Sequence, residues 1–325
     1  MRFVISFVLS FAVSAILGRF LIPWLRALKA GQSIKEIGPV WHMSKQGTPT
    51  IGGLMFIAGI LVAIVLSGWK DFQNGDFGAL FVYLFALVFG VIGFVDDYMK
   101  VKYHKNEGLT APQKFLLQLA AAIAFTVLLR YTGYLTSDLY IPFANVSVQI
   151  PWVIYMIFAA FVMVGTVNAV NITDGVDGLA TGVTIPVALF YLAVSVLWKT
   201  TELEIFSAAL FGGLCAFLIY NFHPAKVFMG DTGSLFLGGA VCGMAFALDM
   251  PLILILVGII YLLETLSDII QVTYYKLTHG KRIFRMAPLH HHFEMGGWSE
   301  EKLFVVFTSV TLIACLLAFF GVMGR

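Results

Sequence analysis

Five aspartates stand where long apolar stretches of the sequence stop. Asp96 and Asp97 occur in GFVDDYMK, Asp174 and Asp177 in NAVNITDGVDGL, and Asp231 in FMGDTGSLF. Each of them alone is explained as a helix cap or a turn residue, because Asp and Asp-Gly favour those positions. Two adjacent acids gain nothing at the C-terminal end of a helix, where the dipole disfavours anions. We therefore expect these carboxylates to share a cation.

Mg²⁺ suits such a site, because it takes hard oxygen ligands and binds through one or two carboxylates together with substrate phosphates. Glycines at positions 175, 178, 230 and 233 flank the acids and let backbone N–H groups approach a ligand. In GDTGS, a turn into the next helix would direct its first N–H groups toward an anion. The pattern predicts a metal-bound diphosphate at these acids.

Two amide side chains precede the second pair of acids. Asn168, Asn171 and Asp174 are spaced three residues apart and share one stripe of a predicted helix, which glycines then end. The alternative interpretation is a polar helix end packed within a helix bundle. Two amides and two carboxylates exceed what capping requires. We therefore expect Asn168 and Asn171 to contact substrate.

Two lysines follow the first pair of acids. Lys100 lies one helical turn beyond it, and Lys114 closes TAPQK, where Thr110 is predicted as an N-cap and Pro112 in the first turn. Each lysine is also explained as one of the basic residues that flank membrane spans. Beside a metal and a diphosphate, either ammonium group would neutralise phosphate oxygens.

Three consecutive histidines, His290, His291 and His292, occur in KRIFRMAPLHHHFE. One metal ion bound by all three is not expected, because neighbouring side chains on an extended backbone point in opposite directions. A polar loop beside the membrane is the simpler alternative. The basic residues before the triplet and the acid after it favour a segment that grips an anionic, hydroxyl-rich substrate.

The composition indicates a membrane protein. Of 325 residues, 60% are hydrophobic and 12% charged, and the mean hydropathy is +0.92, which leaves too little polar surface for a water-soluble body. We predict one all-α integral membrane domain over residues 1–325 with about ten transmembrane helices. The predicted spans are 3–24, 51–66, 77–95, 115–130, 152–170, 179–198, 205–220, 234–248, 252–274 and 303–323.

The distribution of basic residues predicts the orientation of these spans. Most Lys and Arg residues fall in the connections after the first, third, seventh and ninth spans, and basic loops stay in the cytoplasm. Both termini are then extracytoplasmic, and all five aspartates face the cytoplasm. The segment DLYIPFANVSVQIP alternates apolar and polar residues, which predicts a short β-hairpin on the outer face after the fourth helix.

The motifs resemble those of one family. GFVDDYMK, NAVNITDGVDGLA, FMGDTGSLFLGG and APLHHHFE, in this order and with GTPTIGG at 47–53, closely resemble the polyprenyl-phosphate N-acetylhexosamine-1-phosphate transferases, and within them the phospho-N-acetylmuramoyl-pentapeptide transferases. The resemblance implies Mg²⁺-dependent transfer of phospho-MurNAc-pentapeptide from UDP-MurNAc-pentapeptide to undecaprenyl phosphate, giving lipid I and UMP for peptidoglycan biosynthesis.

The resemblance also implies a location and partners. The enzyme would be a multi-pass protein of the bacterial cytoplasmic membrane with its active site on the cytoplasmic side. Its partners would be the nucleotide substrate, the lipid carrier and the bilayer, and no nucleic acid. The oligomeric state is left open, with a homodimer as one alternative.

Individual roles follow from the same resemblance. Asp231 matches the Mg²⁺-binding aspartate, Asp96 and Asp97 match paired acids beside the lipid phosphate, and Asp174 matches another essential acid. A further group matches the region that binds the nucleotide, with an aromatic ring that could stack on uracil, and the histidine triplet matches one proposed to contact substrate. The nucleotide group comprises Asn171, Gly175, Asp177 and Phe228.

The mechanism has two alternatives. Phosphoryl transfer depends on positioning and on charge neutralisation. We favour direct attack of the lipid phosphate on the sugar-linked phosphorus, with Asp97 or Asp96 accepting a proton if the phosphate arrives monoprotonated. A two-step route through an aspartyl-phosphate is the rival.

Two other functions compete with this interpretation. A sister enzyme would transfer GlcNAc-1-phosphate from UDP-GlcNAc to undecaprenyl phosphate, but the uninterrupted histidine triplet favours the muramyl-peptide substrate. An ion-coupled transporter is the alternative from another class, and Glu264 and Asp268 in the ninth span are its strongest support. For these two acids we favour a structural role, in which they face the bundle interior or a break in the helix. A transporter would carry its acids near the middle of the membrane, whereas the five aspartates lie at one side.

Overall fold

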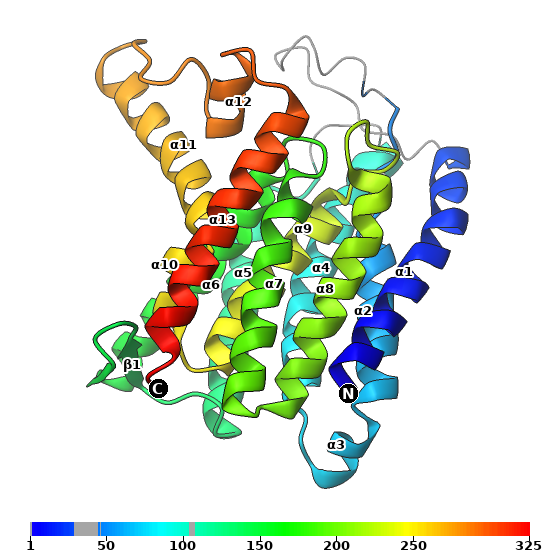
Figure 1. Ribbon diagram of the computed structural model, residues 1–325. Coiled ribbons are helices and arrows are strands. Elements are labelled where there is room, and N and C mark those ends of the chain that lie inside the picture. The colour runs from blue at the N-terminus through cyan, green and yellow to red at the C-terminus, as the bar shows by residue number, and fades with distance from the viewer. Residues whose placement is uncertain (1, 29–44, 46, 104–107) are drawn as a thin grey trace.

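The computed structural model describes residues 2–28, 45, 47–103 and 108–325. Within these ranges the chain is a bundle of long helices with one two-stranded sheet (Figure 1). The first half of the chain contains α1 (Arg2–Ala27), α2 (Leu54–Ser67), α3 (Trp69–Asn74), α4 (Gly78–Tyr103), α5 (Ala111–Tyr131), β1 (Asp138–Ile141), β2 (Val146–Gln149) and α6 (Trp152–Thr173). The second half contains α7 (Leu179–Trp198), α8 (Thr201–Asn221), α9 (Gly230–Ala247), the 3₁₀ turn η2 (Pro251–Ile253), α10 (Leu254–Val257), α11 (Ile259–Leu277), α12 (Leu289–Glu294) and α13 (Glu300–Val322).

The predicted multi-pass helical membrane protein is confirmed. In the described residues, seven helices are long and apolar enough to cross a membrane, and an eighth span results if η2–α10 and α11, bent by 82° at their junction, count as one. The short helix α2 and the buried helix α9 occupy two further predicted spans without belonging to that set. Ten spans therefore stay a prediction.

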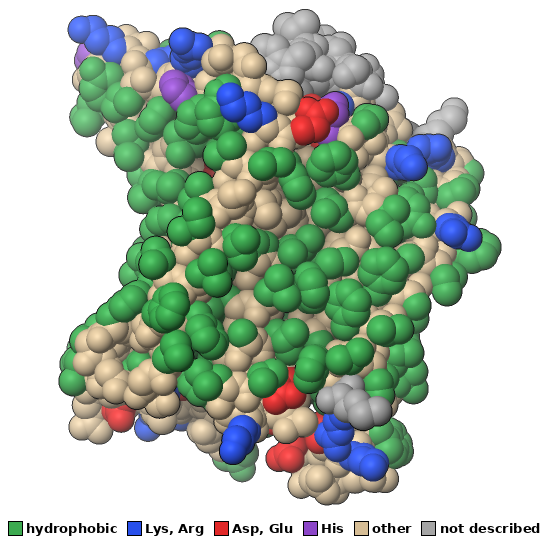
Figure 2. Space-filling model, viewed as in Figure 1, with side chains coloured by type: hydrophobic (Ala, Val, Ile, Leu, Met, Phe, Trp, Pro, Cys, Tyr) green, Lys and Arg blue, Asp and Glu red, His purple; other side chains and the backbone are tan. Residues whose placement is uncertain are grey.

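The surface has the distribution that a bilayer requires. On the face shown in Figure 2, hydrophobic side chains cover the middle of the molecule, whereas most Lys, Arg, Asp and Glu side chains lie toward its two ends. Both chain termini lie at the same end, away from α12 (Figure 1). The five aspartates of the predicted site and the histidine triplet lie toward the opposite end, which we call the α12 end.

Helix α9 occupies the centre of the bundle and is buried from Thr232 to Ala247. Small residues let it lie very close to its neighbours. A Cβ on Gly93 of α4 would clash with the backbone carbonyl of Asp231, and one on Gly238 would lie 2.5 Å from the Cα of Val167 in α6. The start of α9 is therefore fixed against α4 and close to the paired acids.

The histidine triplet forms the short helix α12, so the extended backbone assumed from the sequence is wrong. Pro288 is the N-cap residue and has an extended backbone conformation. A proline is tolerated there because the first N–H groups of a helix have no acceptor within the helix. Successive residues of a helix are about 100° apart. The three imidazoles therefore still point in different directions.

The strands β1 and β2 pair antiparallel between α5 and α6, with Asp138 opposite Gln149. Their connecting turn contacts the end of α13, where the Phe143 amide donates to the Gly321 carbonyl at 2.9 Å and Asn145 Nδ2 to the Gly324 carbonyl at 2.8 Å. The pair lies at the end of the bundle that carries the termini (Figure 1). The side of the membrane that it faces stays a prediction.

Candidate active site

Three of the predicted acids meet at the α12 end. Carboxylate oxygens of Asp96, Asp97 and Asp231 all lie within 4.8 Å of one another. The first two end the buried face of α4, and the third is in the first turn of α9. We call these three residues the acidic cluster. Its donors are all hard carboxylate oxygens, so it could hold a divalent cation.

Lys100 and Lys114 both reach the acidic cluster. Lys100 Nζ lies 2.5 Å from Asp96 Oδ2 and 3.0 Å from Asp231 Oδ2, and Lys114 Nζ lies 2.7 Å from the same Asp231 oxygen. A capping box formed by Thr110 and Gln113 starts α5 and so places Lys114 in its first turn. Two ammonium groups face three carboxylates, so the ionised cluster keeps a net negative charge that a cation could neutralise.

Asp97 is held by the N-terminus of α9. Its Oδ2 accepts hydrogen bonds from the Thr232 amide at 2.9 Å and from Thr232 Oγ1 at 2.7 Å. The amide that the sequence predicts to face a ligand anion thus donates to an internal carboxylate. Asp96 is held in a similar way, because its Oδ1 accepts from the Leu109 amide at 2.8 Å.

The two amides of α6 lie at different places. Asn171 Nδ2 donates to Asp231 Oδ1 at 2.9 Å and to Ser234 Oγ at 2.7 Å, so it orients the carboxylate of the acidic cluster. Asn168 lies one turn earlier and donates instead to Gln118 Oε1 at 2.7 Å. The structure therefore joins Asn171 to the acids and Asn168 to α5.

Asp174 directly follows α6, and the negative charges of the other acids act on its carboxyl group. Burial raises the pKa of its carboxyl well above the usual value, and the carboxylates of Asp231 and Asp97 raise it further, whereas Lys45 opposes them. A charge at Asp174 is therefore disfavoured until positive charge arrives. This is the behaviour expected of an acid beside a metal and phosphate site.

Asp177 belongs to a second ionic group. Its Oδ1 lies 2.7 Å from Lys45 Nζ, and its Oδ2 lies 3.1 Å from His223 Nδ1. Lys45 Nζ also lies 2.6 Å from Glu300 Oε2. Ligand atoms of Asp177, His223 and Glu300 lie within 4.8 Å of one another. This group joins the segment before α2 to the ends of α6, α8 and α13.

Phe228 is fixed through its backbone beside the start of α9. Its amide donates to the Pro49 carbonyl at 2.8 Å, and its carbonyl accepts from the Gly52 amide at 2.9 Å. The GTPTIGG segment therefore lies along residues 228 and 229. The ring is partly exposed, and its predicted stacking on uracil stays a prediction.

Each histidine of α12 uses Nδ1 for a different contact. His291 Nδ1 lies 2.6 Å from Glu294 Oε2, whereas His292 Nδ1 accepts a hydrogen bond from the Arg285 amide at 3.1 Å. His290 is buried and contacts Glu264 of α11. His290 also reaches the turn that carries the acids, because a Cβ on Gly175 would clash with its Nε2.

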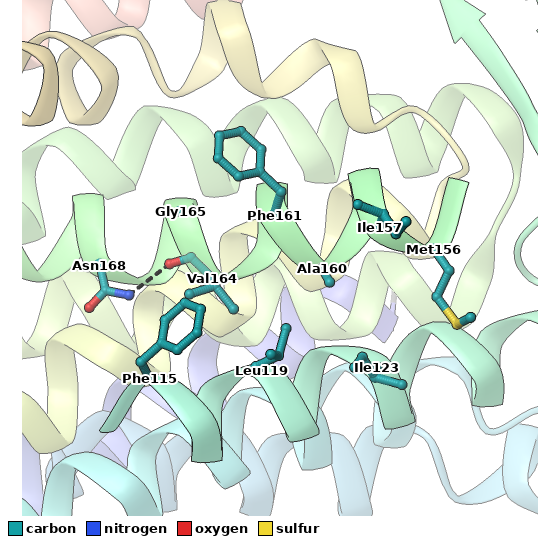
Figure 3. Close-up of a pocket in the computed structure, with 10 residues that line it drawn as sticks. All are labelled: Phe115, Leu119, Ile123, Met156, Ile157, Ala160, Phe161, Val164, Gly165 and Asn168. Atoms are coloured by element: carbon teal, nitrogen blue, oxygen red, sulfur yellow. Dashed lines mark hydrogen bonds between the residues drawn. The ribbon is translucent and has the colours of Figure 1, made fainter. Parts of the chain in front are cut away.

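An apolar groove of about 590 Å³ runs between α5 and α6 (Figure 3). Phe115, Leu119 and Ile123 of α5 form one wall. The wall from α6 is formed by Met156, Ile157, Ala160, Phe161, Val164, Gly165 and Asn168. Ile157 and Phe161 are largely exposed, so the groove opens on the side of the bundle. Asn168 at its end is one helical turn from Asn171, which bonds to Asp231 of the acidic cluster.

Comparison with known proteins places this geometry in a family. A model described as glycosyl transferase family 4 matches residues 79–249. A phospho-N-acetylmuramoyl-pentapeptide-transferase of Clostridium acetobutylicum is 48% identical over 316 residues, which cover 97% of each chain. Those of Carboxydothermus hydrogenoformans and Clostridium perfringens strain 13 are also 48% identical, with 98% of both chains covered. The chain belongs to the phospho-N-acetylmuramoyl-pentapeptide-transferase family.

Membership of this transferase family confirms the resemblance that the motifs predicted. The sequence interpretation nevertheless left several residues of the site without a role. Lys45, His223 and Glu300 had no individual assignment, and Glu264 was considered for ion transport or for a structural role within the bundle. Their partners are between 26 and 255 residues away along the chain, so no local spacing indicates the contacts.

Proposed function

We propose that the protein transfers phospho-MurNAc-pentapeptide from UDP-MurNAc-pentapeptide to undecaprenyl phosphate, producing lipid I and UMP for peptidoglycan synthesis. The relatives are named for this activity, and the chain is similar to them over nearly their whole length. The single structural observation that carries the proposal is the acidic cluster with its two lysines at one end of the bundle. A soluble nucleotide and a membrane lipid can meet only at such a boundary.

Mg²⁺ is the cation that we propose for the acidic cluster. Asp231 is its principal ligand, with Asp96 and Asp97 supplying the neighbouring oxygens. The donor set supports this assignment, because Mg²⁺ prefers carboxylate and phosphate oxygens, whereas the second ionic group includes a histidine, which suits other metals better. When bound, Mg²⁺ would offset the negative charge of the diphosphate.

The chain's own residues then position the reaction. In the direct route, an oxygen of the lipid phosphate forms a bond to the sugar-linked phosphorus as the bond from that phosphorus to the UMP oxygen breaks. Lys100 and Lys114 neutralise phosphate oxygens, and Asp97 or Asp96 accepts the proton of a monoprotonated lipid phosphate. Thr232 keeps Asp97 oriented. Direct transfer leaves no phosphate on the enzyme, so a quench experiment that trapped an aspartyl-phosphate competent for turnover would replace this route.

The apolar groove between α5 and α6 supports a place for the lipid carrier. Its walls are hydrocarbon and aromatic side chains, and it leads from the side of the bundle to Asn168, which lies one helical turn before Asn171 on α6 (Figure 3). Part of the undecaprenyl chain lies in this groove, with its phosphate toward Lys114. The lipid then approaches from within the bilayer.

The nucleotide side lies around the 174–178 turn. Asn171, Asp174, Gly175, Asp177 and Phe228 bind UDP, and the histidines of α12 contact the sugar and its peptide. Lys45 joins this set, because it neutralises Asp177 next to the turn. The active site faces the cytoplasm, and the protein lies in the bacterial inner membrane.

Product analysis tests the function. Purified protein in detergent is mixed with Mg²⁺, undecaprenyl phosphate and either UDP-MurNAc-pentapeptide or UDP-GlcNAc, and UMP and the lipid product are measured. We expect UMP and lipid I from the muramyl substrate and little turnover with UDP-GlcNAc. Equal or better turnover with UDP-GlcNAc would instead assign the sister activity, and solute flux without UMP release would assign transport.

A further inference from the structure

Glu264 is a fully buried acid that the reaction described above does not use. It lies on the one buried face of α11, together with Ile260, Ser267 and Gln271. A buried ionised carboxylate requires hydrogen bonds or a positive partner. Its partner at hydrogen-bond distance is His290, itself only 1% exposed.

Two contacts join Glu264 to His290. Glu264 Oε2 lies 3.0 Å from the ring Nδ1, and Oε1 accepts a hydrogen bond from the His290 backbone amide at 3.2 Å. One carboxylate therefore fixes both the start of α12 and the plane of the imidazole. Gln271, two turns later on the same face, accepts hydrogen bonds from the Ile283 and Phe284 amides at 3.0 Å. Helix α11 thus holds the whole segment that leads to α12.

The bend before α11 makes this arrangement possible. Helix α11 leaves the preceding α10 at 82°, so it diverges from the bundle and reaches α12 at the edge of the α12 end (Figure 1). Its buried polar stripe faces α12 and the segment before it.

The other nitrogen of His290 faces the nucleotide side of the site. Nε2 is buried and has no hydrogen-bond partner among the described residues. It points at Gly175, where any side chain would collide with it, and so at the turn that carries Asp174 and Asp177. A buried polar nitrogen without a partner is unusual, and it is expected where a ligand completes the bonding.

We propose that Glu264 is a positioning residue, which holds the proton of His290 on Nδ1 and so presents the Nε2 lone pair to the sugar-peptide part of the nucleotide substrate. The partner of Nε2 is a hydroxyl or amide N–H group of that substrate. The inference rests on the proposed function for the identity of the substrate. The Glu264–His290 pair itself can be tested without any substrate.

The chemistry follows from the donors and acceptors. The tautomer of a histidine is set by the hydrogen bond that its other nitrogen makes. A carboxylate is acceptor-only, so it can receive both the backbone N–H and the Nδ1–H of His290. In a Glu264→Gln variant, the amide oxygen keeps the backbone N–H and the NH₂ group faces Nδ1. The ring proton must then move to Nε2.

The tautomer is measured by ¹⁵N NMR on histidine-labelled protein in lipid nanodiscs without substrate, with the His290→Gln variant used to assign the signals. We expect Nδ1 of His290 to be protonated in the parent protein and Nε2 to be protonated in Glu264→Gln. Asp268→Asn is the control for charge on the same helix, and Gln271→Leu is the control for loosening the same segment. Neither control should move the proton. A parent protein with an unprotonated Nδ1 would overturn the proposal, even if the variants fail to fold.

Steady-state kinetics tests whether the pair serves the reaction. We expect Glu264→Gln to lower kcat/KM for UDP-MurNAc-pentapeptide by about 10-fold or more while KM for undecaprenyl phosphate stays within about twofold. In the His290→Gln background the same change should have no further effect, because Glu264 acts through His290. Parental kinetics in Glu264→Gln, or an undiminished loss in the double variant, would contradict the positioning role. An inactive parent would count against the proposed function and would leave the NMR result standing.

Discussion

At the scale of single residues, the acidic cluster depends on side chains that hold the acids in place. Asp231 is the most connected of them, because Lys100, Lys114 and Asn171 all bond to its carboxylate. Asp231→Asn keeps the size of the side chain and removes one charge. We expect turnover to fall at least 100-fold, measured as UMP release, while the variant still unfolds in one cooperative transition.

The matched control for this change is Asp71→Asn. Asp71 is also buried and is paired with Arg2, but it lies in α3 at the opposite end of the bundle. We expect this variant to keep its turnover, whatever its stability. Full activity in Asp231→Asn would remove that residue from the reaction centre.

Thr232 provides a test of how Asp97 is positioned. Thr232→Val keeps the shape of the side chain and the backbone amide but removes the hydroxyl that donates to Asp97 Oδ2. Hydrogen bonds to charged groups contribute about 1.5–3 kcal/mol, so we expect kcat to fall about 10- to 100-fold. Thr126→Val is the control, since the Thr126 hydroxyl donates to a carbonyl of its own helix. Equal effects of the two changes would contradict the assignment.

Asp174 gives a prediction about stability and pH. Its pKa is raised in the folded protein, so folding favours the protonated form, and stability falls as pH rises from the unfolded value toward the folded one. Asp174→Asn cannot ionise. Without metal and substrate at pH 8, we expect it to unfold about 2 °C or more above the parent and to lose turnover. The stability difference should shrink as the pH is lowered, and a variant that unfolds earlier at pH 8 would contradict the burial argument.

The sequence predicted the site residues that are recognisable by their type and their place in an apolar run. It missed the residues whose role depends on tertiary contacts. Asp96, Asp97 and Asp231 interrupt apolar runs, which local reasoning detects. The contacts of Lys45 with Glu300 and of Glu264 with His290 depend on how separate helices cross. No periodicity in the chain encodes those crossings.

At the scale of elements, the groove between α5 and α6 can be partly filled by one substitution whose Cβ displaces no neighbouring atom. A side chain at Gly165 would enter open space, because nothing lies within 4 Å of its would-be Cβ. Gly165→Leu should fill part of the groove and raise KM for undecaprenyl phosphate at least fivefold, while KM for UDP-MurNAc-pentapeptide stays unchanged. Leu316→Phe on the exposed face of α13 is the control. A rise in the nucleotide KM alone would contradict the lipid path.

Element boundaries show where sequence patterns are informative and where they are not. The apolar runs predicted the positions of the long helices, and TAPQK predicted the capped start of α5. A helix break was considered near Glu264 and Asp268, but its position between α10 and α11 was not predicted, because residues 252–274 read as one continuous apolar run. Gly258 at the junction is the one local sign of it, and isolated glycines are common in membrane helices.

At the scale of the whole molecule, a cytoplasmic nucleotide substrate requires the α12 end to face the cytoplasm. Lys281→Cys lies beyond α11 at that end, and Gln73→Cys lies in α3 at the other, both at exposed positions. In cells with a permeable outer barrier and an intact inner membrane, we expect an impermeant maleimide to label Gln73→Cys and to spare Lys281→Cys until the cells are lysed. The parent protein reports any labelling of the native cysteines, and the reverse pattern would invert the topology. A homodimer stays a prediction.

The most direct test of the central claim is a titration with Mn²⁺, a paramagnetic stand-in for Mg²⁺, followed by electron paramagnetic resonance on purified protein. We expect one Mn²⁺ site, from which Mg²⁺ displaces the ion. It should be lost in Asp231→Asn and retained in Glu300→Gln, which alters only the second ionic group. Binding that survives Asp231→Asn and disappears in Glu300→Gln would place the metal at the second group and contradict the account.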